Sequence, residues 1–220
     1  MSAKDFVDGA IIGVAQTIIG HPLDTFKTLV QTDISTKIRG QSLKAMYRGV
    51  QIPILFSGIV NSLQFGIFDS TRNHLGIPLA AFISGAISSV AITPHDFIKL
   101  NLQTNHKDNI KFCNIYRGFI LTTLRESMAA SMYFSSYFYL INCCNKHHQW
   151  VHFWIGGLSG CLSWVVTYPI DTIKTRYQIN LSTTVRECMQ LKCLWRGFSY
   201  CMMRAFLVNG TSFFIYDKLK

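Results

Sequence analysis

The sequence predicts an all-α membrane protein with six spanning helices, arranged as three repeats of two helices. Its composition is the first reason: 49% of the 220 residues are hydrophobic and only 15% are charged, against roughly 25% charged in a typical soluble domain. The second reason is a pattern that occurs three times, at intervals of about one third of the chain. In each copy an aspartate, a lysine and a glutamine follow a proline at offsets of two, five and nine residues. The copies are Pro22, Asp24, Lys27 and Gln31, then Pro94, Asp96, Lys99 and Gln103, and then Pro169, Asp171, Lys174 and Gln178.

The first repeat is expected to cover residues 1–75. Residues 6–31 are largely apolar, and about 20 helical residues suffice to cross the hydrocarbon core of a membrane. Pro22 is expected to kink this helix. A polar stretch follows at residues 32–44, and Tyr47-Arg48-Gly49 opens a second apolar run that continues through Phe68.

The other two repeats, residues 76–149 and 150–220, have the same plan. Apolar runs at 77–103 and 150–178 contain Pro94 and Pro169, which are also expected to be kinks. Polar stretches at 105–111 and 180–192 follow, and then an aromatic-Arg-Gly triplet opens the second run. The alternative is a soluble helical bundle. The length and unbroken apolar character of the runs favour membrane spans within a single transmembrane domain.

Charge and cysteine usage exclude several functions. The net charge of +10 fits nucleic acid, anionic lipid or an anionic substrate, but the basic residues form no run or stripe, so we expect no nucleic-acid partner. The seven cysteines lack metal-ligand spacing, and their odd number argues against a complete disulfide framework. We expect no metal, no cofactor and no enzymatic activity. The first ten residues, MSAKDFVDGA, are not expected to form a cleavable signal.

The triplicated Pro-x-Asp-x-x-Lys pattern with its glutamine, and the aromatic-Arg-Gly triplet after each copy, resemble the mitochondrial carrier family over the whole chain. The resemblance implies six tilted helices with pseudo-threefold symmetry around a central cavity, and alternating access in the mitochondrial inner membrane. It also implies a monomeric, multi-pass carrier of a small-molecule solute that binds cardiolipin. The chain is shorter than is usual in the family and lacks the acidic-Gly pair, so we expect trimmed matrix segments.

The triplicated charges predict a gate on the matrix side. An aspartate and a lysine three residues apart lie on one helix face, and neither charge is tolerated alone at membrane depth. The resemblance implies that each aspartate pairs with the lysine of another repeat: Asp24 with Lys99, Asp96 with Lys174, and Asp171 with Lys27. It also implies that Gln31, Gln103 and Gln178 brace these pairs by hydrogen bonds.

The cytoplasmic gate is predicted to be weaker. Asp69 and Asp217 each lie 20 residues after the glycine of their repeat, with Arg72 and Lys220 following them. A helix of that length rises about 30 Å, one hydrocarbon thickness. The second repeat has Phe138 and Ile141 at the matching positions. The family's pairing direction therefore implies one bridge, from Asp217 to Arg72, and a resting state open to the cytoplasm.

Substrate recognition is expected where the repeats differ. Arg125 and Arg204 each lie seven residues after their glycine, roughly 10 Å into the helix, where the first repeat has Phe56. Charge inside a membrane segment indicates a functional site. An internal Arg125–Glu126 pair is the structural alternative. The surroundings of Asn61 and Gln64 resemble those of amino-acid carriers. The candidate substrate-binding residues are therefore Arg125, Glu126, Arg204, Phe56, Asn61 and Gln64.

Arg125 followed by Glu126 resembles the carnitine/acylcarnitine and basic-amino-acid branch of the family. The resemblance implies that Arg125 and Arg204 hold a carboxylate and that Glu126 holds an ammonium group. Val60 stands where some ornithine-type carriers have an acid, which disfavours a dibasic substrate. The sequence thus predicts a carrier of an amino acid or carnitine-like zwitterion. The alternatives are a nucleotide or deoxynucleotide carrier, with both arginines on phosphates, and a non-transporting membrane adaptor that kept the fold.

Overall fold

The structure is a computed structural model that describes residues 3–32, 46–104, 110–143, 149–179, 184–189, 194–205 and 207–208. Within these ranges every regular element is a helix, which confirms the all-α prediction. The long helices are α1 (Ala3–Gln31), α3 (Gln51–Leu75), α4 (Ile77–Gln103), α5 (Phe119–Cys143) and α6 (Gln149–Ile179), and the short ones are η3 (Phe112–Asn114) and α7 (Val185–Cys188). Residues 198–205 and 207–208 are also helical and are called the last helical segment below.

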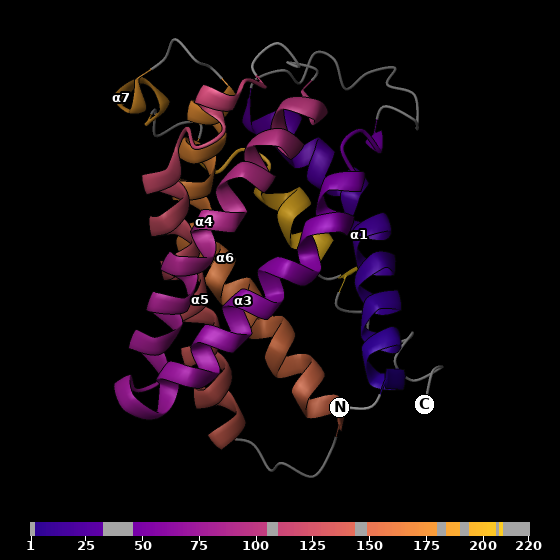
Figure 1. Cartoon of the computed structure of the whole chain (residues 1–220), viewed down its shortest axis with the longest axis vertical. Coiled ribbons are helices and arrows are strands. Elements are labelled where there is room, and N and C mark those ends of the chain that lie inside the picture. Colours follow the sequence, from indigo (N-terminus) through magenta and orange to yellow (C-terminus); the bar gives the residue numbers. More distant parts are fainter. Residues whose placement is uncertain are drawn as a thin grey trace.

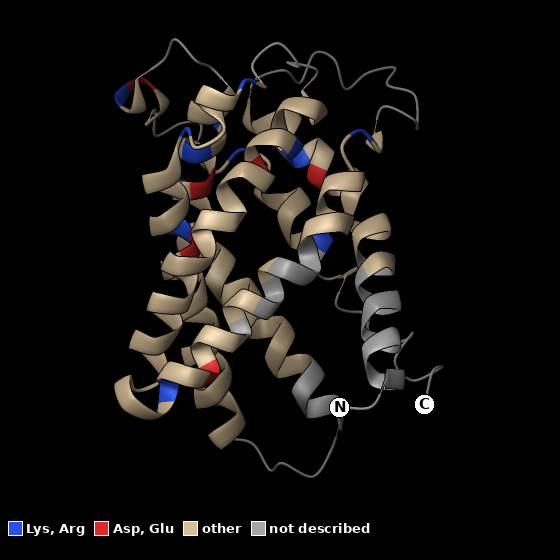
Figure 2. Cartoon of the chain, in the orientation of Figure 1, with Lys and Arg blue, Asp and Glu red and all other residues tan. Residues whose placement is uncertain are grey.

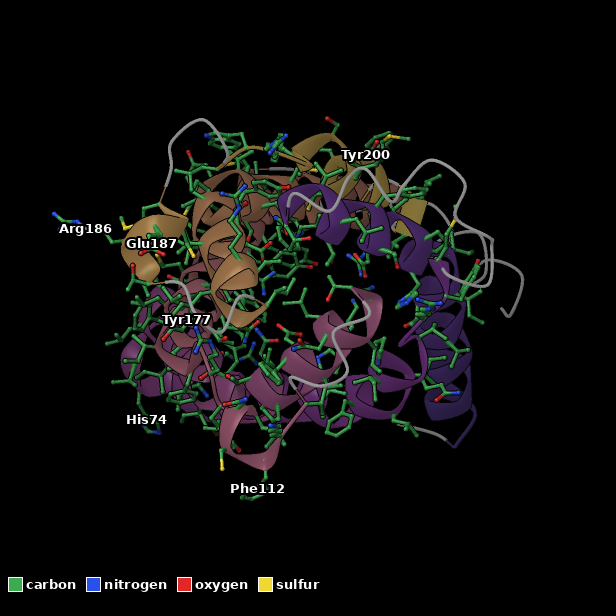
Figure 3. All side chains as sticks on the ribbon, turned by 90° about the horizontal axis from the view of Figure 1, so that it is seen from above. His74, Phe112, Tyr177, Arg186, Glu187 and Tyr200 are labelled. Atoms are coloured by element: carbon green, nitrogen blue, oxygen red, sulfur yellow. The ribbon has the colours of Figure 1, made fainter. Side chains whose placement is uncertain are left out.

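The long helices run along the longest axis of the molecule, and α3 crosses the bundle obliquely (Figure 1). They contain 25 to 31 residues, which corresponds to roughly 37 to 47 Å. Seen from above, the helices are arranged in a ring (Figure 3). The labelled side chain of Phe112, which is 92% exposed, points away from this ring.

The distribution of polar and apolar residues is inverted relative to a water-soluble protein. Among the described residues, buried polar side chains outnumber buried hydrophobic ones. Serines and threonines such as Ser84, Ser88 and Thr93 are completely buried in α4, whereas Phe82, Ile87 and Val90 of the same helix are exposed. A polar interior with an apolar outer surface is expected for a protein surrounded by lipid, since lipid is as apolar as the side chains that face it.

Measured by length and hydropathy alone, α4 is the one described helix that is apolar enough to cross a membrane, with a mean hydropathy of 1.6 over its best window. The sequence analysis predicts six spans, so this criterion supports only part of the prediction.

The three predicted proline positions lie inside helices, in α1, α4 and α6 respectively. The aromatic-Arg-Gly triplets form the turns that precede α3, α5 and the last helical segment. Gly49, Gly118 and Gly197 have φ angles of 79°, 78° and 82°, a backbone conformation that residues with a Cβ atom rarely adopt.

Each of these glycines also contacts a helix from another repeat. A Cβ atom at Gly49 would lie 3.2 Å from Leu102 Cβ of α4, and one at Gly118 would lie 3.1 Å from Gln178 Cγ of α6. A Cβ atom at Gly197 would lie 3.2 Å from the Lys27 carbonyl oxygen of α1. The turns therefore hold the carboxyl-terminal parts of α1, α4 and α6, which carry the triplicated charges, against one another.

Candidate substrate cavity and its ion pairs

A cavity of about 330 Å³ lies between the helices, lined by residues of α1, α3, α4, α5, α6 and the last helical segment. This volume is at the lower end of the range for small-molecule sites. Figure 2 shows that the charged residues of the long helices gather mainly in the upper half of the bundle. Nine Lys, Arg, Asp and Glu residues line the cavity: Asp24, Lys27, Asp96, Lys99, Arg125, Glu126, Asp171, Lys174 and Arg204.

The structure joins the three aspartates and three lysines in the predicted cyclic order. Lys99 Nζ lies 2.8 Å from Asp24 Oδ2, Lys174 Nζ lies 2.5 Å from Asp96 Oδ2, and Lys27 Nζ lies 2.7 Å from Asp171 Oδ2. Each pair links two repeats, and the side chains are at most 28% exposed. The pairs therefore tie α1, α4 and α6 together at one level of the bundle.

Two of these aspartates also bind an arginine. Arg204 Nε lies 2.6 Å from Asp24 Oδ1. Its N–H makes no hydrogen bond in the structure, so this contact is an ion pair only. Arg125 Nε lies 3.6 Å from Asp171 Oδ1, and the Arg125 guanidinium also forms an ion pair with Glu126.

These contacts differ from the sequence analysis, which places substrate recognition apart from the gate. In the structure Arg125 and Arg204 contact Asp171 and Asp24 of the predicted matrix gate, and the internal Arg125–Glu126 pair is present as well. The reason is the length of the arginine side chain, which spans more than one helical turn.

Trp164 of α6 supports the two cations closest to it. Its ring lies 4.3 Å from Lys27 Nζ and 4.7 Å from the Arg125 guanidinium carbon. Lys27 is also 5.4 Å from the centre of the Tyr168 ring. A cation over an aromatic face is attracted by the electron-rich ring. Trp164 thus allows two like-charged groups to share Asp171, a role that sequence reasoning about charge pairs missed.

The three glutamines behave differently from one another. Gln31 Nε2 donates to Asp171 Oδ2 and to Thr172 Oγ1, both at 3.2 Å, so it contacts an ion pair as predicted. Gln103 Nε2 donates to Thr25 Oγ1 at 3.2 Å and its Oε1 accepts from Thr28 Oγ1 at 3.1 Å. Gln178 Nε2 donates to the Arg117 carbonyl oxygen at 3.0 Å.

In the structure the glutamine in contact with an ion pair is Gln31, whereas Gln103 and Gln178 are hydrogen-bonded to other groups. Gln31 and Gln103 each reach the threonine that follows an aspartate of another repeat, Thr172 or Thr25. The corresponding residue for Gln178 is Phe97, which is completely buried and has no hydroxyl. Gln178 lies beside the Gly118 turn instead, where the Arg117 carbonyl accepts its hydrogen bond.

His95 is a polar cavity residue that sequence reasoning missed. Its Nδ1 lies 2.8 Å from Asp96 Oδ1, while Lys174 contacts the other oxygen of the same carboxylate. The signal was present in the sequence, because the matching positions of the other repeats are Leu23 and Ile170.

The candidate substrate residues on α3 are only partly placed in the cavity. Gln64 lines it, together with Val60 and Pro53. The Phe56 ring lies 5.9 Å from the His95 ring and is not among the lining residues. The side chain of Asn61 lies outside the described part of the chain.

At the other end of α3, Arg72 Nε lies 3.3 Å from Asp69 Oδ1 of the same helix, and both side chains are well exposed. Asp217 and Lys220 lie outside the described residues, so the bridge from Asp217 to Arg72 stays a prediction. On the same side, the Phe68 and Phe134 rings stack at 4.1 Å over Ala80 and Ala81 and join α3, α4 and α5.

Close contact between α4 and α5 positions Glu126. A Cβ atom at Gly85 would lie 2.5 Å from the Glu126 carbonyl oxygen, so glycine permits this approach. Ser89 Oγ and Thr123 Oγ1 are hydrogen-bonded at 2.7 Å one turn away. On the other side of α5, Ser163 Oγ of α6 donates to the Ala129 carbonyl at 3.0 Å.

Known proteins resemble this chain over most of its length. The family model for mitochondrial carrier proteins matches residues 2–78 and 145–220. The mitochondrial arginine transporter of Arabidopsis thaliana is 30% identical over 97% of this chain and 89% of its own length. The mitochondrial basic amino acids transporter of Rattus norvegicus is 30% identical over 96% of this chain and 87% of its own length. The glutamate/glycine mitochondrial carrier of Schizosaccharomyces pombe is 27% identical over 98% of this chain and 93% of its own length. This chain therefore belongs to the mitochondrial carrier family.

Proposed function

We propose that this chain carries an amino acid or a carnitine-like zwitterion across the mitochondrial inner membrane by alternating access. The observation that carries the proposal is the cavity, in which Arg204, Arg125 and Glu126 offer groups of both signs to a zwitterion. The relatives are named as carriers of arginine, of basic amino acids, and of glutamate or glycine, and these names support an amino acid as the solute. In this proposal the chain is a multi-pass protein of three two-helix repeats with six tilted helices.

Binding proceeds by exchange of ionic partners. The substrate carboxylate takes Arg204 from Asp24, and Asp24 keeps Lys99 at 2.8 Å. The substrate ammonium takes Glu126 from Arg125, and Arg125 keeps Asp171 at 3.6 Å. Each protein charge that gives up one partner retains another. The substrate thus enters without leaving an unpaired charge in the interior, which would cost several kcal/mol.

This exchange couples the cavity to the gate. In the proposal the three Asp–Lys pairs close the matrix side, and Gln31 strengthens the pair between Lys27 and Asp171. Because Arg204 and Arg125 contact Asp24 and Asp171 directly, occupation of the cavity changes the surroundings of two of the three pairs. A substrate that rearranges these contacts can lower the barrier to opening, as is required when binding energy drives a conformational step.

The proposed assembly is a monomer with cardiolipin at its matrix side, as the family resemblance implies. Purified protein in cardiolipin-containing and cardiolipin-free detergent would check both points. We expect one protein copy per micelle by light scattering and a higher unfolding temperature with cardiolipin. A dimer, or equal unfolding temperatures, would contradict this part of the proposal.

Reconstitution into liposomes tests the function. Uptake of labelled neutral and basic amino acids, carnitine, ATP and dATP is measured with and without internal substrate. We expect uptake of an amino acid or carnitine, and its loss in the Glu126→Gln variant. Uptake restricted to ATP or dATP, unaffected by Glu126→Gln, would support the nucleotide alternative. A folded protein that takes up nothing from the panel would support the adaptor.

A further inference from the structure

The residues that line the cavity also restrict the charge and the position of the side chain of the transported amino acid. We propose that the site accepts an amino acid with an uncharged side chain, that this side chain lies against α3, and that dibasic amino acids are rejected. The inference rests on the proposed function, since it assumes that an amino acid occupies the cavity. It departs from the basic solutes named for two of the relatives.

Among the described residues that line the cavity, every carboxylate already has a cationic partner. Four acidic residues line it, and each already contacts a cation. Asp24 holds Lys99 and Arg204, and Glu126 holds Arg125. Asp171 holds Lys27 and Arg125, and Asp96 holds Lys174. A zwitterion uses the two exchanges that leave every protein charge with a second partner, namely at Asp24–Arg204 and at Glu126–Arg125.

The second positive charge of a dibasic substrate has no exchange that leaves another carboxylate for the displaced cation. At Asp96 it would either displace Lys174 from Oδ2, and Lys174 is only 3% exposed, or displace His95 from Oδ1 and share one carboxylate with Lys174. If it took Asp171, Lys27 and Arg125 would lose the carboxylate that they share. A buried cation without its partner is strongly unfavourable.

The side of the cavity formed by α3, called the α3 wall below, is uncharged. The α3 residues that line the cavity are Pro53, Val60 and Gln64, and α3 contains no charged residue from Gln51 to Phe68. The charged lining residues all come from the other helices. Among the described elements that line the cavity, α3 is the one that contributes no charged side chain, so we place the side chain of a substrate bound to Arg204 and Glu126 against α3. A side-chain carboxylate would find no cation on this wall either.

The pair arginine and citrulline provides the test, because the two molecules have nearly the same shape and differ in the charge of the terminal group. In proteoliposomes we expect kcat/KM for citrulline to exceed that for arginine roughly tenfold or more. Glutamate serves as the acidic probe and is expected to be as poor as arginine. A preference of the unmodified protein for arginine or glutamate would overturn the inference and leave amino-acid transport standing. Absence of any amino-acid uptake by folded protein would overturn the proposed function itself.

Substitutions on α3 locate the effect. Gln64→Glu keeps the side-chain shape and adds a carboxylate to the wall, so the ratio of arginine to citrulline transport should rise about tenfold. Gln64→Lys should lower this ratio and raise glutamate transport. Ser70→Glu adds the same charge as Gln64→Glu at an exposed position of the same helix and should leave the ratio unchanged. Equal shifts in Gln64→Glu and Ser70→Glu would show that α3 does not contact the substrate side chain.

Discussion

The Gly85→Ala substitution tests whether the α4–α5 contact positions the binding residues. The added Cβ atom would lie 2.5 Å from the Glu126 carbonyl oxygen and 2.8 Å from both the Glu126 carbonyl carbon and Ser127 Cα. These are backbone atoms and cannot rotate away. Carbon atoms in ordinary contact are about 3.5 to 4.0 Å apart, so α5 has to move away from α4 by roughly 1 Å.

This displacement has two expected consequences. Overpacking of a filled interior costs about 1 to 3 kcal/mol of stability. A shift of about 1 Å in residues that hold a substrate can lower the rate about a hundredfold, and Arg125 and Glu126 move with the α5 backbone. We therefore expect Gly85→Ala to unfold at a lower temperature and to transport about ten- to a hundredfold more slowly.

Gly160→Ala is the matched control. It lies inside α6, and a Cβ atom there meets no heavy atom within 4 Å. Alanine is the better helix former by about 0.8 to 1.0 kcal/mol, so this variant should be at least as stable as the unmodified protein and fully active. Thermal unfolding in detergent and initial uptake rates in proteoliposomes compare the two. If Gly85→Ala matched Gly160→Ala in both measurements, the positioning argument would be refuted.

Three further variants test the ionic network and the turns. Asp171→Asn removes the carboxylate from Lys27 and Arg125, and should lower the unfolding free energy by about 3 to 5 kcal/mol. The double variant Asp171→Leu/Lys27→Met should recover this stability but not transport. A double variant as unstable as Asp171→Asn would contradict this expectation. Among the three glutamines, Gln31 is the one with a hydrogen bond to an ion pair. Gln31→Ala should therefore lower the free energy of unfolding by about 1 to 3 kcal/mol more than Gln178→Ala does. Equal unfolding temperatures of the two variants would argue against a stabilising role of Gln31 at the ion pair. Tyr168→Phe removes the 2.7 Å hydrogen bond to the Arg196 carbonyl. The variant should unfold at a temperature about 2 to 4 °C lower and should still take up substrate. Loss of uptake would instead assign Tyr168 a role in the transport step.

The triplication predicts that the aspartates and lysines pair between repeats, and the resemblance to the mitochondrial carrier family implies which aspartate pairs with which lysine. A buried charge needs a partner, and three equivalent helices around an axis offer the partner only on a neighbouring repeat. The same symmetry misled the interpretation of the glutamines. The decisive difference lies one residue after each aspartate, where Thr25 and Thr172 have hydroxyl groups and Phe97 has none. A comparison of all positions of the three repeats, beyond the charged ones, would have identified it.

The contacts of Arg125 and Arg204 could not be read from spacing along their own helices. Their reach depends on side-chain conformation and on how closely neighbouring helices approach. For Arg204, the approach is set partly by Gly20 of α1, where a Cβ atom would lie 3.3 Å from Arg204 Nε. His95 could have been found, since it is the polar member of an otherwise apolar position. Trp164 could not, because its two cation contacts come from α1 and α5.

The long sequence separation of the ion-pair partners has a consequence for biosynthesis. Asp24 is synthesised 75 residues before Lys99, and Lys27 is synthesised two repeats before its partner Asp171. When the first helix leaves the ribosome, the carboxylate of Asp24 and the ammonium of Lys27 lack the partners that they have in the folded protein, Lys99 and Asp171, and charge in hydrocarbon is costly. The first helix is therefore expected to remain in contact with water or an insertion factor until the third repeat has been made. Membrane integration of this chain is then a late event that the last ion pair completes.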